Sequence, residues 1–483
     1  MAKFTNYAGR FCESEYESAF LSYLETEGWS YLAGNNIPRG SKREVLYIDD
    51  MEQFLCKTNP ELTADEIRQI LDTVRLAGGE SDFAALHKVY GWMVNGISFV
   101  PKSGQPKMVA LIDFEHPERN IFRTVNQFTV EYTNNGQTEN RRPDILLFIN
   151  GMPLCVIELK NPADANATIY DAWEQINIRY WRDIPHLLHY CPLACISDGV
   201  KTVRTPYEHF YAWRRVNDGD KVSTLPFDEL ETMVKGVYAP ARFLEIFRDY
   251  IYFQDSEYDG DEREIVCRYP QFFAARLLKQ SIVKSVKEKS GKGGTYFGAT
   301  GCGKTYTMAF LARQLALRCS DVPEIGSPTI VMIVDREELQ KQSAKLFTKS
   351  KEFLNLGEVS VVESRRTLRQ ELGARASGGF YICTIQKFCD REDDKIGLIN
   401  NRANIICFSD EAHRTQLEHA KKIQFSKDSD ENMRAMISKP YAKVLREAFP
   451  QATFVGFPVP PIAEYSAIIV VSLFPDSFPS NRS

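Results

Sequence analysis

Long apolar runs are absent from this sequence of 483 residues. The N-terminal stretch MAKFTNYAGRFCESEYE has no apolar core of signal-peptide length, and the late run AIIVVSLF is far too short to span a bilayer. CxxC pairs are also absent, and the 11 cysteines show no tight regular spacing, which argues against a structural zinc site and against a disulfide framework. We therefore expect a cytoplasmic protein with reduced thiols and no membrane partner.

An excess of positive charge is missing as well. The formal net charge is −5, so any contact with nucleic acid must come from a local basic patch. No internal repeat or low-complexity block occurs, and the hydrophobic share of 43% and charged share of 25% are those of an ordinary globular protein. A chain of this length is too long for one compact core, which predicts two or three domains.

Three zones differ in their residue pattern. Residues 1–215 mix helical and strand signals, and residues 216–262 run into the acidic, glycine-containing DSEYDGDERE, which is typical of an exposed linker. Residues 263–457 alternate helical stretches with five β-rich runs, GTYF, TIVMIVD, FYICTI, NIICFSD and ATFVGF. Several of these runs are apolar without alternation, as expected for parallel strands buried on both faces. This zone is therefore predicted to be a doubly wound α/β domain with a parallel sheet.

The first of these runs leads directly into GATGCGKT, which fits the phosphate-loop pattern G-x-x-x-x-G-K-[ST] without a mismatch. A helical stretch follows, so the order is strand, loop and helix. The loop backbone and the helix N-terminus suit phosphate binding, with Lys304 at the β- and γ-phosphates and Thr305 on Mg²⁺. A glycine-rich turn without a ligand is the alternative. The predicted ATP-binding residues of the loop are Gly298, Ala299, Thr300, Gly301, Cys302, Gly303, Lys304 and Thr305.

A second motif, DEAH, ends the apolar strand IICFS. An acid at the end of a buried strand suits a nucleotide-bound Mg²⁺, so Asp410 is predicted to serve the metal and Glu411 to orient or deprotonate the attacking water. Taken alone, the motif could equally be a helix N-terminus capped by Asp410. Its position about a hundred residues after a phosphate loop favours the functional interpretation.

In this order after GATGCGKT, the segments VDREELQKQ, TIQKF, DEAHRTQ and FVGF resemble those of superfamily-two DNA translocases, most closely the motor-nuclease (R) subunits of type I restriction enzymes. The resemblance covers almost the whole chain to Phe457. It implies an α/β protein with a PD-(D/E)xK endonuclease domain over 1–215, a linker over 216–262 and a first RecA-like translocase lobe over 263–457.

The resemblance also implies roles for further residues of the motor lobe. His413 joins the ATP site, and Gln271 in RYPQFFAARLL matches the glutamine that contacts adenine. A surface helix residue is the alternative for Gln271. The residues expected on the DNA-facing side of the lobe are Arg336, Thr384, Gln386 and Lys387.

Cofactors and partners follow from the same resemblance. We expect Mg²⁺ and ATP as cofactors and double-stranded DNA as the substrate, with ATP-driven translocation before cleavage. In the family, a specificity subunit reads the DNA sequence, and a methylase subunit binds S-adenosylmethionine. A stand-alone ATP-dependent nuclease or helicase of another defence system and an inert DNA- or ATP-binding remnant are the alternatives.

The nuclease pattern of this family is met by PDILLFINGMPLCVIELK, residues 143–160. PD contributes Asp144, and ExK contributes Glu158 and Lys160. Two converging carboxylates bind Mg²⁺ through hard oxygen ligands, and the lysine positions the attacking water or steadies the phosphate. The alternative is that these charges merely end two strands.

The register of this hairpin decides between the two interpretations. Asn150-Gly151 predicts a tight turn, and a simple two-residue turn would place Asp144 and Glu158 on opposite faces. Metal binding requires both carboxylates on one face. We therefore predict a three-residue connection with Gly151 in a left-handed bulge position, or a bulge elsewhere in the strands.

Three further residues have weaker signals. In DAWEQINIRYWRDIP, Gln175 matches a catalytic glutamine of the family, but Tyr180 follows one residue later than the family spacing Q-x-x-x-Y. One extra residue rotates a helical side chain by about 100°, so Tyr180 either belongs to a local distortion or is simply core. Glu17, in a predicted first helix, is either an auxiliary acid or a surface residue.

The family pattern is lost at Pro458, where PVPPIAEYS stands in place of the usual TGTPI-type continuation. Residues 458–483 are expected to be an aberrant tail of a frameshifted or otherwise truncated product, without the second lobe and without the region that docks on the methylase. An authentic divergent tail is the alternative. Such a chain would bind Mg-ATP weakly and would not translocate DNA, because the second lobe supplies the arginine fingers.

Overall fold

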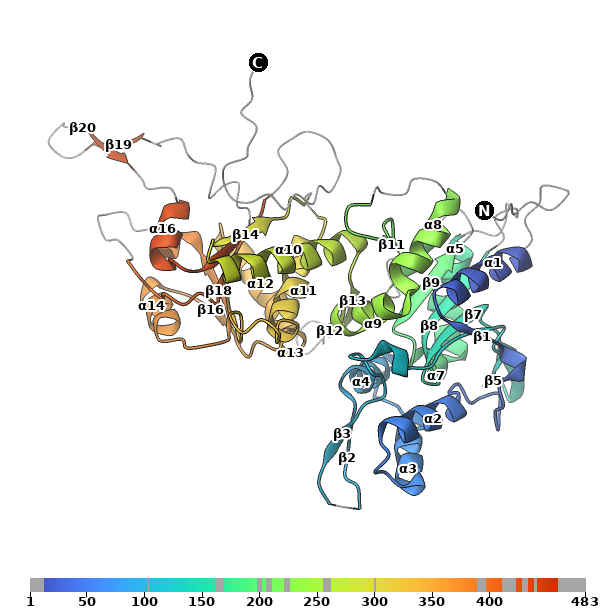
Figure 1. Cartoon of the computed structure of the whole chain (residues 1–483). Helices are drawn as coiled ribbons and strands as arrows, with labels where there is room; N and C mark the ends of the chain where they lie inside the picture. The colour runs from blue at the N-terminus through green and yellow to red at the C-terminus, as the bar shows by residue number, and fades with distance from the viewer. Residues whose placement is uncertain are drawn as a thin grey trace. The chain divides into compact units, whose positions relative to one another are not determined.

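The computed structural model (Figure 1) describes residues 13–102, 104–160, 169–197, 202–205, 211–220, 226–254, 262–298, 301–388, 397–410, 423–427, 433–437 and 441–458. It divides into two compact units, Met1–Tyr269 and Pro270–Ser483. Over the described residues, no helix has both the length and the apolar character needed to cross a bilayer.

The first unit is built on a seven-stranded mixed sheet. Its central strands β7 and β8 are buried along their whole length, so both faces of the sheet are covered at this point. Two smaller pairs, β2 with β3 and β5 with β6, stand outside it. In sheet order, the strands are β1 (Ser30–Ala33), β4 (Phe122–Asn126), β7 (Ile145–Ile149), β8 (Met152–Leu159), β9 (Leu193–Ser197), β10 (Thr202–Thr205) and β11 (Tyr211–Ala212); the outer pairs are β2 (Ile97–Phe99), β3 (Lys107–Val109), β5 (Val130–Asn134) and β6 (Gln137–Arg141).

Helices of the first unit begin with clear sequence signals. Thr63 and Glu66 form a reciprocal capping box at the start of α3, and the Ser81 hydroxyl caps α4. Short 3-10 turns lie at Gly34–Asn36 and Pro117–Arg119. The helices are α1 (Glu13–Thr26), α2 (Ile48–Thr58), α3 (Ala64–Arg75), α4 (Asp82–Asn95), α5 (Ile169–Glu174), the π-helix η3 (Gln175–Tyr180), α6 (Trp181–Asp183) and α7 (Pro185–Leu188).

The expectation of an exposed linker over 216–262 is wrong for most of that range. Phe243, Phe247 and Tyr250 recur at helical spacing and are fully buried in the first unit. The expectation was based on the acidic stretch 255–264, of which residues 255–261 lie outside the described residues and Arg263 and Glu264 form part of a strand. The elements of this region are α8 (Pro226–Met233), the π-helix η4 (Val234–Tyr238), α9 (Pro240–Asp249) and β12 (Ile251–Gln254), which pairs with β13 (Arg263–Val266).

The second unit contains a six-stranded sheet in which every pair is parallel, as predicted for a doubly wound α/β domain. All five predicted β-rich runs form strands of this sheet. β16, which has only three residues and none of them buried, was not predicted. In sheet order, the strands are β14 (Lys292–Thr295), β21 (Thr453–Phe457), β18 (Ile405–Asp410), β15 (Thr329–Val334), β17 (Phe380–Thr384) and β16 (Val359–Val361). A separate antiparallel pair is formed by β19 (Ile423–Lys427) and β20 (Met433–Ile437).

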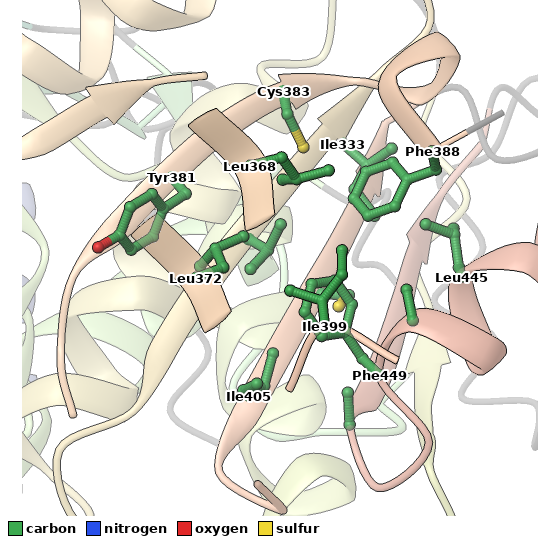
Figure 2. Packing of buried hydrophobic residues seen from close by; sticks show 14 of the residues in the cluster. Ile333, Leu368, Leu372, Tyr381, Cys383, Phe388, Ile399, Ile405, Leu445 and Phe449 are labelled. Atoms are coloured by element: carbon green, nitrogen blue, oxygen red, sulfur yellow. The ribbon is translucent and has the colours of Figure 1, made fainter. Parts of the chain in front are cut away.

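Helices cover the sheet, and Figure 2 shows the packing on one face. Leu368 and Leu372 of one helix, Leu445 of another, and Phe449, which directly follows that second helix, pack on apolar strand residues such as Ile333. The alternate residues of β15 are equally buried on the other face, which explains its unbroken apolar sequence. The helices are α10 (Tyr269–Glu288), α11 (Lys304–Leu317), α12 (Glu337–Lys349), α13 (Lys351–Leu354), α14 (Arg365–Gly373) and α16 (Tyr441–Ala448), with a 3-10 turn at Ile385–Phe388.

Candidate functional site

The hairpin of β7 and β8 closes with a two-residue turn. Ile149 pairs with Met152, and Asn150 and Gly151 both have positive φ, of 50° and 79°. A Cβ on Gly151 would lie 2.1 Å from the Tyr47 carbonyl oxygen, so only glycine fits this position. The predicted three-residue connection is therefore wrong.

A bulge inside the hairpin changes the register, which the longer turn was expected to do. Between the pairs Leu147–Cys155 and Phe148–Pro153 the register shifts, and Leu154 is the extra residue. Residue numbers of paired positions add to 301 next to the turn and to 302 beyond the bulge. Asp144 and Glu158 are consequently on the same face, which confirms the alternative of a bulge elsewhere in the strands.

Glu158 lies at the centre of this face and is fully buried. Its Oε1 accepts a hydrogen bond from the Tyr180 hydroxyl at 2.6 Å, and its Oε2 accepts one from Gln175 Nε2 at 2.7 Å. Burial, and after it the negative charge of Asp144, raises the pKa of Glu158 well above its ordinary value. Two carboxylates that repel each other in this way favour a cation between them.

Asp144 and Lys160 complete the predicted trio. Asp144 is partly exposed, and its Oδ2 accepts a hydrogen bond from the Leu159 main-chain N–H at 2.8 Å. Lys160 Nζ donates to Gln175 Oε1 at 2.9 Å and lies 4.0 Å from Glu158 Oε2. The residues predicted from the sequence are thus brought together. Asp144 is partly exposed, whereas Glu158 is fully buried.

The extra residue between Gln175 and Tyr180 is absorbed by the π-helix η3, which spans these two residues. A π-helix has wider turns than an α-helix, so side chains five positions apart come onto one face. Gln175 Nε2 donates to the Tyr180 hydroxyl at 2.8 Å, and both side chains reach Glu158. The sequence left the role of Tyr180 open. Its side chain is 1% exposed and so belongs to the core, and its hydrogen bond to Glu158 makes it part of the site as well.

Divalent metal ions fit the chemistry of this donor set. Carboxylate oxygens are the ligands that Mg²⁺ prefers, and Mg²⁺ usually binds through one or two carboxylates with water and phosphate filling the remaining positions. Among the described residues, no group of three or more His, Cys, Asp or Glu side chains is arranged to hold a metal ion. Asp144 and Glu158, which share one face of the hairpin, are the carboxylates that would hold one here. Both oxygens of Glu17 accept hydrogen bonds from the side-chain amides of Asn126 and Gln127, and a role of Glu17 as an auxiliary acid stays a prediction.

The phosphate loop of the second unit lies between β14 and α11. Gly303 has φ 82° and directly precedes Lys304, the first residue of α11. Lys304 Nζ donates to the Gly298 carbonyl at 3.4 Å, which curls the side chain over the loop. Ala299 and Thr300 lie outside the described residues.

Gln271 contacts this loop from α10. It is 3% exposed, and its Nε2 donates to the carbonyl oxygens of Cys302 and Gly303 at 3.4 and 3.3 Å. The alternative of a surface helix residue is therefore wrong, and contact with adenine stays a prediction. A Cβ on Gly303 would approach Gln271 Nε2 to 2.4 Å, so the glycine is needed for this contact.

Asp410 ends β18, two strands away from β14 in a sheet where all neighbours are parallel. The carboxyl ends of parallel strands meet at one edge, so Asp410 and the loop residues Lys304 and Thr305 belong to the same edge. Glu411 and His413 lie outside the described residues.

The four residues expected to face DNA lie at the carboxyl ends of β15 and β17. Arg336 is exposed, and Gln386 is exposed and donates to the Asp335 carbonyl at 2.7 Å. Thr384 is buried. Lys387 Nζ donates to Gln340 Oε1 at 3.2 Å and to the Val362 carbonyl, so its ammonium group has two hydrogen-bond partners within the protein. DNA contact by these residues stays a prediction.

Gln340 was not singled out from the sequence. It is buried and donates to the carbonyls of Val362, which directly follows β16, and of Ile382 in β17, at 3.1 and 3.0 Å. Its position in VDREELQKQ was the available signal, because a glutamine at a core position of an amphipathic helix needs a polar partner.

Two family descriptions match the chain in succession. Residues 11–206 match the type I restriction enzyme R protein N terminus, and residues 270–474 match the SWI2/SNF2 ATPase. The second match continues past Pro458, where the family pattern was expected to end. The two matched domains imply the use of ATP and of a divalent metal ion.

Named relatives agree with these matches. The type I restriction enzyme HindI endonuclease subunit of Haemophilus influenzae is 31% identical over 472 residues, which cover 93% of this chain and 43% of that protein. A candidate type I restriction enzyme MjaIXP endonuclease subunit of Methanocaldococcus jannaschii is 28% identical over 503 residues, covering 97% and 44%. The chain thus spans less than half the length of these relatives.

One solved structure is also similar. It is a fragment of a candidate HsdR subunit of a type I restriction enzyme from Vibrio vulnificus, with 15% identity and a TM-score of 0.24, covering 71% of this chain and 51% of that chain.

Proposed function

The chain is an HsdR-like protein, and from this premise we propose that its first unit is a Mg²⁺-dependent endonuclease for double-stranded DNA and its second unit the ATP-binding lobe of a DNA translocase. The proposal extends to the partners of the relatives. In a type I restriction complex, a specificity subunit would select the DNA, and the methylase subunit would bring S-adenosylmethionine.

The observation that carries the nuclease proposal is the convergence of Asp144, Glu158 and Lys160 on one face of the hairpin. The bulge at Leu154 shifts the register by one residue and thereby brings the two carboxylates to this face. Gln175 links the lysine to the glutamate, because it accepts from Lys160 and donates to Glu158.

Each protein group has a role that its position supports. Mg²⁺ would be held by Asp144 and Glu158 and would activate water and neutralise charge on the scissile phosphate. Lys160 places its positive charge beside Glu158 and would orient the attacking water or a phosphate oxygen. Tyr180 and Gln175 hold the Glu158 carboxylate in one rotamer, and their hydrogen bonds favour its charged form.

The proposal for the second unit rests on Lys304, Thr305 and Asp410 at one edge of the parallel sheet. Lys304 would neutralise the β- and γ-phosphates of ATP, while Thr305 and Asp410 would serve its Mg²⁺. Glu411 and His413 are proposed to complete this site from the sequence motif alone.

Cleavage of plasmid DNA by the full chain, with Mg²⁺ or with EDTA, tests the nuclease proposal. We expect Mg²⁺-dependent cleavage that is lost in Lys160→Ala and Asp144→Ala and retained in Lys57→Ala, an exposed lysine of α2. Binding of a fluorescent ATP analogue should be unchanged in all three variants, since it belongs to the second unit. Cleavage that survives both active-site substitutions would refute the proposal.

A further inference from the structure

A cluster of two amides and one carboxylate lies beside the proposed nuclease centre, at the end of β4. Asn126 Nδ2 donates to Glu17 Oε1 at 2.6 Å, and Gln127 Nε2 donates to Glu17 Oε2 at 3.1 Å. The Gln127 main-chain N–H donates to the carbonyl oxygen of Asp144 at 2.9 Å. The cluster therefore reaches one of the two proposed metal ligands through its backbone.

Asn126 and Glu17 belong to the face of the sheet opposite to Glu158. Asn126 pairs with Ile145, which in turn pairs with Ile157, and paired residues of antiparallel strands share a face. Ile157 precedes Glu158 in the same strand, so their side chains point to opposite faces.

Gln127 would point to the Glu158 face if β4 simply continued, because consecutive strand residues alternate. It has φ 52° instead, in the left-handed region that side chains other than glycine rarely adopt. This conformation turns its side chain back to Glu17, so that Asn126 and Gln127, although consecutive, both bond the same carboxylate. Rare backbone conformations of this kind persist only where neighbouring groups hold them, and they are concentrated at functional sites.

We propose that Gln127, anchored by Glu17, is a positioning residue for the metal-binding carboxylate of Asp144. The anchor has two effects. It fixes the strand end that hydrogen-bonds to the main chain of Asp144, and it keeps a long amide side chain away from the face on which the metal and the scissile phosphate would bind. This inference rests on the proposed nuclease function, and it gives Glu17 a role as anchor instead of metal ligand.

Titration of the full chain with Mn²⁺, followed by electron paramagnetic resonance of the free ion, tests the inference without DNA cleavage as the readout. Loss of a group that orients a metal ligand typically weakens metal binding by about 10- to 100-fold. We expect a loss of at least about 10-fold in Gln127→Gly, which keeps the backbone conformation but removes the anchor, and in Glu17→Ala. Gln127→Asn, whose side chain tolerates this conformation but is too short for Glu17, should behave like Gln127→Gly.

Two further variants serve as controls, and two outcomes would contradict the account. Asn355→Gly relaxes another residue of positive φ, 51°, in the second unit and should leave Mn²⁺ affinity unchanged. The double variant Glu17→Ala with Gln127→Gly should bind Mn²⁺ about as well as either single variant, since both remove one interaction. If Glu17 were itself a ligand, Gln127→Gly would bind Mn²⁺ normally, and this result would overturn the inference. Absence of saturable Mn²⁺ binding in the unaltered chain would instead refute the nuclease centre on which the inference rests.

Discussion

The Tyr180 hydroxyl is predicted to control metal binding at Glu158, and Tyr180→Phe tests this with the loss of one oxygen atom. The hydroxyl donates to Glu158 Oε1 at 2.6 Å in a fully buried environment. This hydrogen bond lowers the pKa of Glu158, against the larger effects of burial and of the Asp144 charge. Its removal should raise that pKa further, so that a proton competes more strongly with the metal.

The size of the effect follows from the charge on the acceptor. Hydrogen bonds to charged groups contribute about 1.5–3 kcal/mol. At about 1.4 kcal/mol for each tenfold change, metal affinity should fall by roughly 10- to 100-fold at a pH where Glu158 is protonated in the metal-free protein. At higher pH the proton no longer competes, and the difference between variant and unaltered chain should shrink.

Calorimetric titration of Mg²⁺ or Mn²⁺ over a series of pH values is the suitable assay. Tyr190→Phe is the matched control, because Tyr190 is also buried and its hydroxyl donates to the Val74 carbonyl at 2.6 Å, away from the carboxylates. Both variants should lose stability, but only Tyr180→Phe should lose metal affinity. Equal metal affinity in Tyr180→Phe and the unaltered chain at every pH would refute this reasoning.

Three further predictions concern single residues. The pKa of Glu158 is raised, so in EDTA the folded protein holds a proton that the unfolded chain releases above about pH 4. The contribution of this group to the free energy of unfolding in urea should be full below that pH and should be lost as pH rises through the raised pKa. The difference in free energy of unfolding between the unaltered chain and Glu158→Gln should therefore decrease with rising pH. Gly303→Ala places a Cβ against Gln271 at φ 82° and should abolish the thermal shift caused by ATP, whereas an undiminished shift would contradict the role of the loop. Gly151→Ala should destabilise the first unit by about 3 kcal/mol or more, because strain at φ 79° adds to a clash with the Tyr47 carbonyl; urea unfolding within about 1 kcal/mol of the unaltered chain would count against the tight turn.

Much of the second unit could be predicted because its strands are buried on both faces. Unbroken apolar runs such as TIVMIV mark parallel strands directly, and the phosphate loop marks where the sheet carries its ligand. β16 escaped because its three residues are only partly covered and leave no such run.

In the hairpin of the first unit, sequence reasoning predicted the shared face and offered a bulge as one of two ways to reach it, but did not place the bulge. The chemistry of Asp144 and Glu158 required an even register, but the sequence did not locate the extra residue. Asn150-Gly151 formed the tight turn that its residues favour, and Leu154 took the bulge, although an apolar leucine between two strand residues carries no bulge signal.

Two other differences have tertiary causes. The spacing of Gln175 and Tyr180 did not reveal a π-helix, because wider helical turns are stabilised by the contacts both side chains make with Glu158. For residues 216–262, the stretch DSEYDGDERE, six of whose ten residues are acidic, outweighed an amphipathic helix in which Phe243 and Phe247 are buried. The acidic composition was a property of the end of that region only, and the rest of the region is packed into the first unit.

Crystals of the protein soaked in Mn²⁺ would test the central claim most directly, through the anomalous scattering of the metal. The account predicts a peak at about 2.0–2.2 Å from carboxylate oxygens of both Asp144 and Glu158, the distance typical of such hard cations. The absence of a peak at these two carboxylates at saturating Mn²⁺ would contradict the assignment of this hairpin as a metal-dependent nuclease centre.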